Sequence, residues 1–215
     1  MRQFKPKPYT ASQTILANRL FFRESMRTIR VTASVLPSSR FLTVAMLEKV
    51  DFCSARTFVE LGSGTGAITR EILRRMTPDS RLFALEINRN FIHHLRAHCQ
   101  DGRLTLLEND AADLIYQLRR YKPGPVHAVI SSLGLTSMSP DQRVRIVQAA
   151  KECLAPSGVM TQFQYLTSQA PVLDFHNTEI RRFQARNFLS GYFSRVSSKR
   201  VLLNLPPAEV FTCRK

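Results

Sequence analysis

The segment 57–69 constrains the fold of this chain more than any other part of the sequence. Residues 57–61 are mostly apolar, β-branched or aromatic, which is typical of a buried strand. Three glycines follow at alternate positions, and a helical pattern begins at Ala67. Glycines are favoured in such a loop because the backbone must turn sharply and a ligand can approach where no Cβ intrudes. The segment therefore predicts a strand, a tight binding loop and a helix.

The spacing of the glycines indicates which ligand the loop binds. A dinucleotide loop has the pattern G-x-G-x-x-G, which places a pyrophosphate on the helix N-terminus. Here the pattern is G-x-G-x-G, and Glu60 precedes it at the end of the strand. A carboxylate beside the loop would repel a pyrophosphate but suits a cationic or zwitterionic ligand. The run Glu60–Gly66 resembles the cofactor loop of class I S-adenosylmethionine-dependent methyltransferases, and a glycine turn that binds nothing is the alternative.

Strands and helices alternate along the chain after this loop. Alternation at this pitch is typical of an α/β fold with a parallel sheet and helices on both faces. The expected strands are 57–61, 81–86, 103–108, 126–131 and 158–165, with two more near 191–203 and 208–213. The expected helices are 11–31, 41–50, 67–76, 89–99, 111–121, 141–154 and one near 176–188. We therefore expect a Rossmann-like sheet of seven mostly parallel strands with an N-terminal amphipathic helical extension.

In such a sheet the ligand binds beyond the carboxyl ends of the strands, at the point where the strand order reverses. Glu86 ends the second strand, where its carboxylate can accept both ribose hydroxyls, and Ile87 beside it can pack on the adenine. Asp110 either accepts the adenine amino group or caps the helix that follows, and the two roles are compatible. The predicted cofactor-binding residues are Glu60, Gly62, Ser63, Gly64, Gly66, Glu86, Ile87, Asp110, Ala111 and Ser131.

Methyl transfer leaves the protein mainly with positioning and desolvation, because the cofactor carries the reactive group. If the acceptor is an amine it must be neutral to attack, and a protein base or solvent removes its proton. Ser131 and Tyr165 are the candidate catalytic residues, although the sequence slightly favours a core tyrosine with its hydroxyl at the surface for Tyr165. His127 lies at a strand start, away from the site, and we expect solvent exposure rather than metal binding for His93, His94 and His98.

The cysteines and the N-terminal residues indicate in which cellular compartment the protein is expected. Four cysteines lie far apart without a C-x-x-C pair, which indicates a reduced, cytosolic protein without a zinc site. We therefore predict no metal. The first residues contain no apolar stretch of the kind found in signal peptides, and no run approaches ~20 consecutive apolar residues. Any contact with a membrane is therefore expected to be peripheral.

The charge of the chain predicts an anionic partner. The formal net charge is +15, which favours nucleic acid or an acidic membrane surface over a merely solubilising role. Residues 1–50 hold nine basic side chains against two acids. In helical projection, apolar residues of segment 15–30 form a stripe flanked by arginines, a pattern that suits a helix lying in a headgroup layer or one packed on the domain. We divide the chain into a basic membrane-binding and lid segment, 1–50, and a catalytic domain, 51–215. The predicted membrane-binding residues are Arg19, Phe22, Arg23, Met26, Arg27 and Arg30.

Particular segments resemble the bacterial phospholipid N-methyltransferases, which are similar to the rRNA adenine dimethylases. The resemblance covers most of the chain from about residue 20. It includes the Pro37-Ser38-Ser39 segment, the glycine loop and the runs 84–88, 109–114 and 130–133. It ends with the Q-F-x-Y run 162–165 and the N-L-P-P-A-x-V run 204–210.

This resemblance implies stepwise methylation of phosphatidylethanolamine toward phosphatidylcholine, with S-adenosylhomocysteine as the product of the cofactor. It also implies peripheral binding to the inner, cytoplasmic face of the cell membrane through an N-terminal helix that binds anionic lipid and covers the active site. Leu133 and Gly134 follow the serine pair where the rRNA enzymes carry a tyrosine to stack on a flipped base, which makes nucleic acid unlikely as a substrate. A nucleic-acid adenine methyltransferase, an ornithine-lipid N-methyltransferase and a membrane-binding module without catalysis remain the alternatives.

Overall fold

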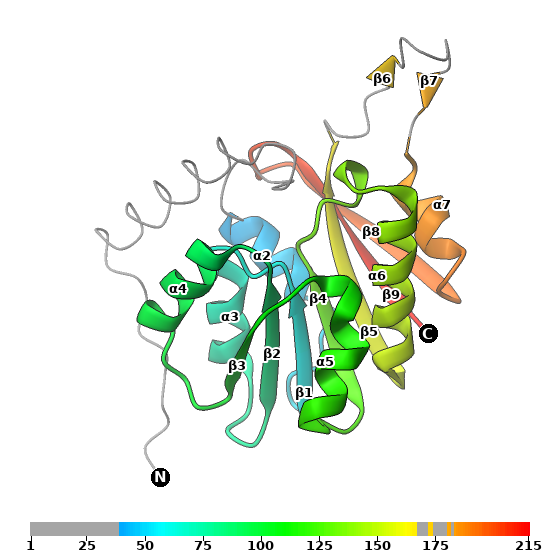
Figure 1. Ribbon diagram of the computed structural model, residues 1–215. Coiled ribbons are helices and arrows are strands. Elements are labelled where there is room, and N and C mark those ends of the chain that lie inside the picture. Colours follow the sequence, from blue (N-terminus) through cyan, green and yellow to red (C-terminus); the bar gives the residue numbers. More distant parts are fainter. Residues whose placement is uncertain (1–38, 167–171, 174–179, 182) are drawn as a thin grey trace.

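The computed structural model describes residues 39–166, 172–173, 180–181 and 183–215 (Figure 1). Within this part of the chain, no helix is long and apolar enough to cross a membrane. The predicted helix 11–31 lies outside the described residues. So do its six membrane-binding candidates, Arg19, Phe22, Arg23, Met26, Arg27 and Arg30.

A seven-stranded sheet forms the centre of the molecule, as predicted, with strand order β3-β2-β1-β4-β5-β9-β8. Neighbouring strands are parallel from β3 to β5, whereas β9 is antiparallel to both β5 and β8. The strands are β1 (Thr57–Leu61), β2 (Arg81–Glu86), β3 (Leu104–Glu108), β4 (Val126–Ser131), β5 (Leu154–Tyr165), β8 (Arg195–Val201) and β9 (Ala208–Arg214). A separate short pair contains β6 (Val172–Leu173) and β7 (Ile180–Arg181). The strand order reverses between β1 and β4, so a ligand-binding crevice is expected there.

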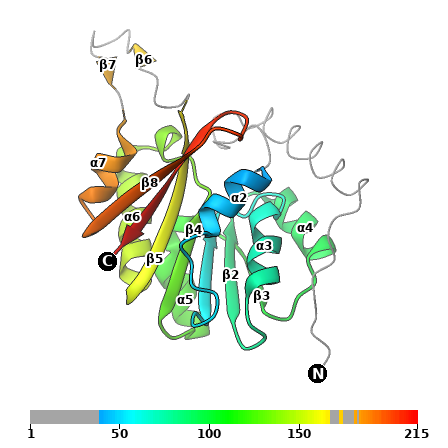
Figure 2. The ribbon, with the colours of Figure 1, turned by 180° about the vertical axis from the view of Figure 1, so that it is seen from behind.

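Helices cover both faces of this sheet, which makes three layers (Figures 1 and 2). On one face lie α2 (Arg40–Leu47), α3 (Ala67–Arg75) and α4 (Arg89–His98). On the other lie α5 (Leu114–Tyr121), α6 (Pro140–Cys153) and α7 (Ala185–Ser190). Two 3-10 turns, Ala111–Asp113 and Leu135–Ser137, follow β3 and β4.

The core consists of one apolar cluster on each face of the sheet. All five residues of β1 are buried, because this central strand is covered on both sides. Helix α2 begins at the N-cap Ser39, whose Oγ accepts a hydrogen bond from the Leu42 N–H at 3.2 Å. Its residues Leu42 and Met46 are fully buried in the same cluster as α3. The described end of segment 1–50 therefore packs on the catalytic core, while the boundary at residue 50 stays a prediction.

Several expected bounds in the C-terminal half differ from the structure. Strand β5 begins at Leu154 rather than 158, and β8 begins at Arg195 rather than 191. The helix expected near 176–188 is wrong at Ile180–Arg181, which form strand β7, and α7 begins only at Ala185. Phe183 before that helix is held by its ring contact with Phe188, at 5.5 Å between centroids, and lies under the Arg143 guanidinium.

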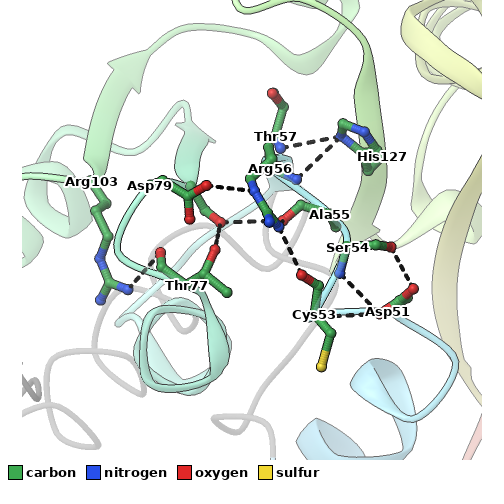
Figure 3. Close-up of polar contacts among 11 residues, drawn as sticks. Asp51, Cys53, Ser54, Ala55, Arg56, Thr57, Thr77, Asp79, Arg103 and His127 are labelled. Atoms are coloured by element: carbon green, nitrogen blue, oxygen red, sulfur yellow. Dashed lines mark hydrogen bonds and ion pairs between the residues drawn. The ribbon is translucent and has the colours of Figure 1, made fainter.

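Polar contacts connect residues at the end of the sheet where the parallel strands begin (Figure 3). The Arg56 side chain pairs with Asp79 at 2.6 Å and donates to the Cys53 carbonyl at 2.8 Å. The His127 Nδ1 accepts from the Thr57 N–H at 3.3 Å. This histidine therefore belongs to the structural edge, away from the carboxyl ends of the strands, as expected.

Candidate functional site

The glycine loop between β1 and α3 has a backbone that only glycine adopts easily. Gly62 and Gly66 have φ angles of +78° and +85°, in the left-handed region. A Cβ on Gly62 would lie 2.8 Å from the Leu133 side chain, and one on Gly66 would lie 2.5 Å from the Leu95 side chain. The loop is thus pressed between the end of β4 and helix α4, which explains why side chains are excluded from it.

Glu60 lies directly beneath this loop and is fully buried. Its Oε2 accepts a hydrogen bond from the Thr69 hydroxyl of α3 at 2.7 Å, and the Ser63 side chain of the loop is a second partner of the carboxyl group. Burial raises the pKa of Glu60 to about 7; the charge of Glu86 adds to the shift and the Thr69 bond opposes it. A buried carboxyl group attracts a cationic group when it is ionised.

Glu86 joins the glycine loop to the end of β2. Its two oxygens accept from the backbone N–H of Gly64 and of Asn88, each at 2.8 Å. Burial raises the pKa of Glu86, and these two N–H donors oppose the shift. The adjacent Ile87 is 59% exposed, so an apolar surface stands open beside this carboxylate. The arrangement fits the predicted ribose and adenine contacts, which stay predictions.

Asp110 follows β3 at the same edge of the sheet. Its Oδ1 accepts from the Ala112 N–H at 2.8 Å, which confirms the helix-capping role expected for it. Ala111 beside it is buried. Contact between Asp110 and an adenine amino group stays a prediction compatible with this cap.

Ser131 ends β4 and pairs with Leu61 of β1 on one side and Gln162 of β5 on the other. Its side chain is fully buried, and its Oγ accepts from the Leu133 N–H at 3.5 Å. This weak bond shapes the loop that presses on Gly62. A role for Ser131 next to the transferred methyl group stays a prediction.

Buried polar side chains of β5 extend the site beyond β4, and we did not predict them. The Gln162 Nε2 donates to the Leu133 carbonyl at 2.7 Å, but its Oε1 has no partner among the described residues. Gln164 is 5% exposed, and neither its Oε1 nor its Nε2 has a partner there. The Ser132 Oγ is also unpaired within the described chain. Polar residues at alternate positions of an otherwise buried strand are the signal that could have revealed them.

Tyr165 and His94 are both buried, whereas exposure was expected for the histidine. Tyr165 is buried, with its ring edge-on to Phe163 at 5.2 Å, in the cluster that contains α2 and α3. The expectation of solvent exposure is wrong for His94, which is 7% exposed and stacks on His98 at 4.4 Å. Burial lowers the pKa of His94 to about 4, with the charges of His98 and Arg70 adding to the effect. Within the described residues, no group of histidine, cysteine or acidic side chains has the arrangement of a metal site.

The residues around the loop fit S-adenosylmethionine by their chemistry. The ligand is a cation with a polar ribose and a flat adenine. Glu60 offers a buried carboxyl group, Glu86 offers acceptor oxygens, and Ile87 offers an exposed apolar side chain. The Ser63 side chain is buried next to Glu60, and its hydrogen bond to this carboxyl group opposes the rise of the Glu60 pKa. The bare glycine backbone between them allows close approach.

Comparison with known proteins agrees with this geometry. A family model described as a methyltransferase domain matches residues 58–158. An ornithine lipid N-methyltransferase of Singulisphaera acidiphila is 31% identical over 183 residues, which cover 85% of this chain and 88% of the relative. The similarity therefore extends beyond the matched domain on at least one side.

Two solved structures share the fold at low identity. A putative O-methyltransferase from Klebsiella pneumoniae has a TM-score of 0.61 and 14% identity, covering 97% of this chain and 92% of its own. The 1,6-didemethyltoxoflavin-N1-methyltransferase of Burkholderia thailandensis, solved with bound 1,6-didemethyltoxoflavin and S-adenosylhomocysteine, has a TM-score of 0.60 and 17% identity, with the same coverage. These likenesses establish the architecture, while family membership rests on the lipid enzyme.

Proposed function

Since the chain belongs to the class I S-adenosylmethionine-dependent methyltransferases, we propose that it methylates the amine of a membrane lipid. The observation that carries this proposal is the 31% identity to an ornithine lipid N-methyltransferase over most of both chains. The segments that resemble phospholipid N-methyltransferases point to the same class of acceptor. S-adenosylmethionine is the cofactor and supplies an activated methyl group on a positively charged sulfur.

The residues of the chain act by binding, orienting and excluding water. Glu60 and Glu86 place two carboxyl groups beside the glycine loop, and their ionised forms favour a cationic cofactor. Ile87 offers an apolar surface for the adenine. After transfer the cofactor has lost its sulfonium charge, so the same carboxylates hold the product less strongly and favour its release.

The end of β5 supports an amine as the acceptor. Gln162 and Gln164 keep amide oxygens that are buried and unpaired within the described residues, and such oxygens accept from an amine N–H. We propose that they orient the headgroup nitrogen and that solvent takes its proton before the methyl transfer. The loop after Ser131 carries no aromatic side chain for stacking on a flipped base, so base methylation is less well supported.

Two lipids satisfy this description. Phosphatidylethanolamine follows from the sequence resemblance, and ornithine lipid follows from the relative's name. We place ornithine lipid first because the identity extends over 88% of that relative, and phosphatidylethanolamine, with its mono- and dimethyl derivatives, second. In both cases we propose that the protein acts on the inner face of the cell membrane, bound to anionic lipid through the arginines at 19, 23 and 27.

Transfer of labelled methyl groups from S-adenosylmethionine tests this function. Vesicles with and without anionic lipid are prepared with ornithine lipid or with phosphatidylethanolamine, and rRNA is offered in a parallel reaction. We expect label in at least one amine lipid and none in RNA. Label in RNA alone would overturn the lipid assignment, and a Glu86→Ala variant controls for dependence on the cofactor site.

A further inference from the structure

The tip of the β8–β9 hairpin exposes three leucines to solvent. Leu202, Leu203 and Leu205 are 68%, 73% and 76% exposed, the highest values among the large apolar residues that the structure describes as exposed. Tips of hairpins are usually polar with turn-forming residues, since apolar side chains there gain nothing from the core. Three leucines at one tip therefore indicate a surface that is covered by a partner.

The tip lies at the same edge of the sheet as the glycine loop. Strand β5 runs parallel to β4 and continues past it, because Ser131 at the end of β4 pairs with Gln162. Tyr165, three residues further along β5, pairs with Ala208 at the start of β9. The hairpin connection thus projects beyond the carboxyl ends of the strands, and Figures 1 and 2 show it beside the start of α2.

Hydrogen bonds hold this tip in place. Asn204, between the exposed leucines, is 4% exposed. Its Oδ1 accepts from the Ser39 N–H at 3.3 Å, and its Nδ2 donates to the Pro206 carbonyl at 2.6 Å. The Leu166 N–H donates to the Pro207 carbonyl at 2.9 Å, which ties the tip to the end of β5. The leucines are therefore presented outward by a braced loop.

Helix α2 adds apolar and basic side chains next to the tip. The Asn204 bond to Ser39 places the first turn of α2 at the hairpin. Phe41 on this turn is 52% exposed, and Arg40 is exposed beside it. Arg200, near the end of β8, is also exposed. An apolar centre with cations at its rim matches the boundary between acyl chains and anionic headgroups.

We propose that the tip formed by Leu202, Leu203 and Leu205 inserts into the lipid surface, with Phe41 beside it, and so holds the carboxyl edge of the sheet over the membrane. A projecting apolar tip with a basic rim fits a fluid lipid surface better than a second copy of this strongly basic chain, whose like charges repel. The inference rests on the proposed function for its purpose, because it brings the lipid amine to the cofactor site.

A single tryptophan reports the insertion directly, since the chain contains none. The variant Leu203→Trp is mixed with vesicles of phosphatidylethanolamine and phosphatidylglycerol, some carrying brominated acyl chains. We expect a blue-shifted emission that bromine quenches. Tyr121→Trp is the matched control, because this residue is 41% exposed at the end of α5, and its emission should not change. An unshifted, unquenched Leu203→Trp signal on vesicle-bound protein would overturn the proposal.

A second variant separates this surface from the N-terminal helix and from catalysis. Replacement of all three leucines with serine should weaken vesicle binding at least about tenfold. Binding of S-adenosylhomocysteine and methylation of a short-chain amine lipid dispersed in detergent should stay unchanged. If wild-type protein does not methylate the dispersed lipid, the proposed function fails while the fluorescence still decides insertion. Dimers that dissociate in the serine variant would overturn the proposal in favour of a second copy.

Discussion

Glu60 determines how the cofactor site responds to pH. Its pKa of about 7 in the cofactor-free protein means that half of the molecules hold a neutral carboxyl at that pH. A cationic cofactor binds the ionised form better, so its affinity should rise with pH and level off above about 7. Below that value we expect a loss of up to about tenfold per pH unit, as for linkage to one proton. Calorimetric titration with S-adenosylmethionine at a series of pH values around 7 measures this change in affinity.

The Glu60→Gln variant provides the control for this titration. It should bind the cofactor more weakly and with an affinity that no longer changes around pH 7. The pKa also predicts stability, because the folded protein holds a proton between the ordinary value of 4.5 and about 7 that the unfolded chain releases. The wild type should thus lose stability as pH rises through this window, and Glu60→Gln should not. The same slope in both proteins would assign the titration to another group.

Gln164 lets stability and function be separated at one residue. Its amide is buried without a partner among the described residues, which costs about 1–3 kcal/mol. Gln164→Leu should therefore raise the melting temperature of the cofactor-free protein and raise the KM for the lipid. Thr161→Val is the matched control, because the Thr161 Oγ1 is likewise buried and unpaired there but lies deeper in β5. It should stabilise without changing KM, and equal kinetics for both variants would contradict a headgroup role for Gln164.

At the scale of elements, the glycine loop couples β1, α3 and α4. Gly66→Ala forces a side chain to a φ of +85° and against Leu95 of α4, so it should destabilise by at least about 1 kcal/mol and weaken cofactor binding. Gly102→Ala is the control, because nothing lies within 4 Å of a Cβ at that position, and it should be neutral or slightly stabilising. Urea unfolding and calorimetry measure both effects. Equal losses at the two glycines would contradict the packing argument.

The central elements could be predicted from the sequence, because strands buried on both faces have nearly continuous apolar runs. The bounds of β1, β2 and β4 match the prediction. Strand β8 is harder to predict, since Arg195–Val201 is mostly polar. This segment forms a strand because it pairs with β9 at the edge of the sheet. The helix expected near 176–188 failed for a similar reason, since local periodicity does not reveal the pairing of β7 with β6.

The candidate site could be predicted in part. The glycines, Glu60 and Glu86 could be predicted, because each stands at or just after the end of a strand that the sequence reveals. The structure brings them together at the carboxyl ends of the strands. Gln162 and Gln164 could not be linked to this edge without knowing how far β5 extends past β4. The burial of His94 was also missed, since its spacing with His93 and His98 placed all three on one polar face, whereas the helix turns His94 inward.

In the whole molecule, the candidate functional residues lie at one end of the sheet, where the parallel strands finish. The glycine loop, the unpaired glutamines and the leucine tip all lie where the parallel strands end. At the opposite end of the sheet, where these strands begin, Arg56 and His127 make contacts that hold the structure together. A net charge of +15 would draw the protein to an anionic surface, and the tip would set which edge faces the lipid.

Lipid mass spectrometry shows whether a membrane lipid amine accepts the methyl group in cells. The chain is expressed in a bacterium that makes phosphatidylethanolamine and ornithine lipid but no N-methylated lipid. We expect amine lipids carrying one, two or three added methyl groups, and none with the Glu86→Ala variant. An unchanged lipid profile, with purified protein that still binds S-adenosylmethionine, would contradict a lipid amine as the acceptor.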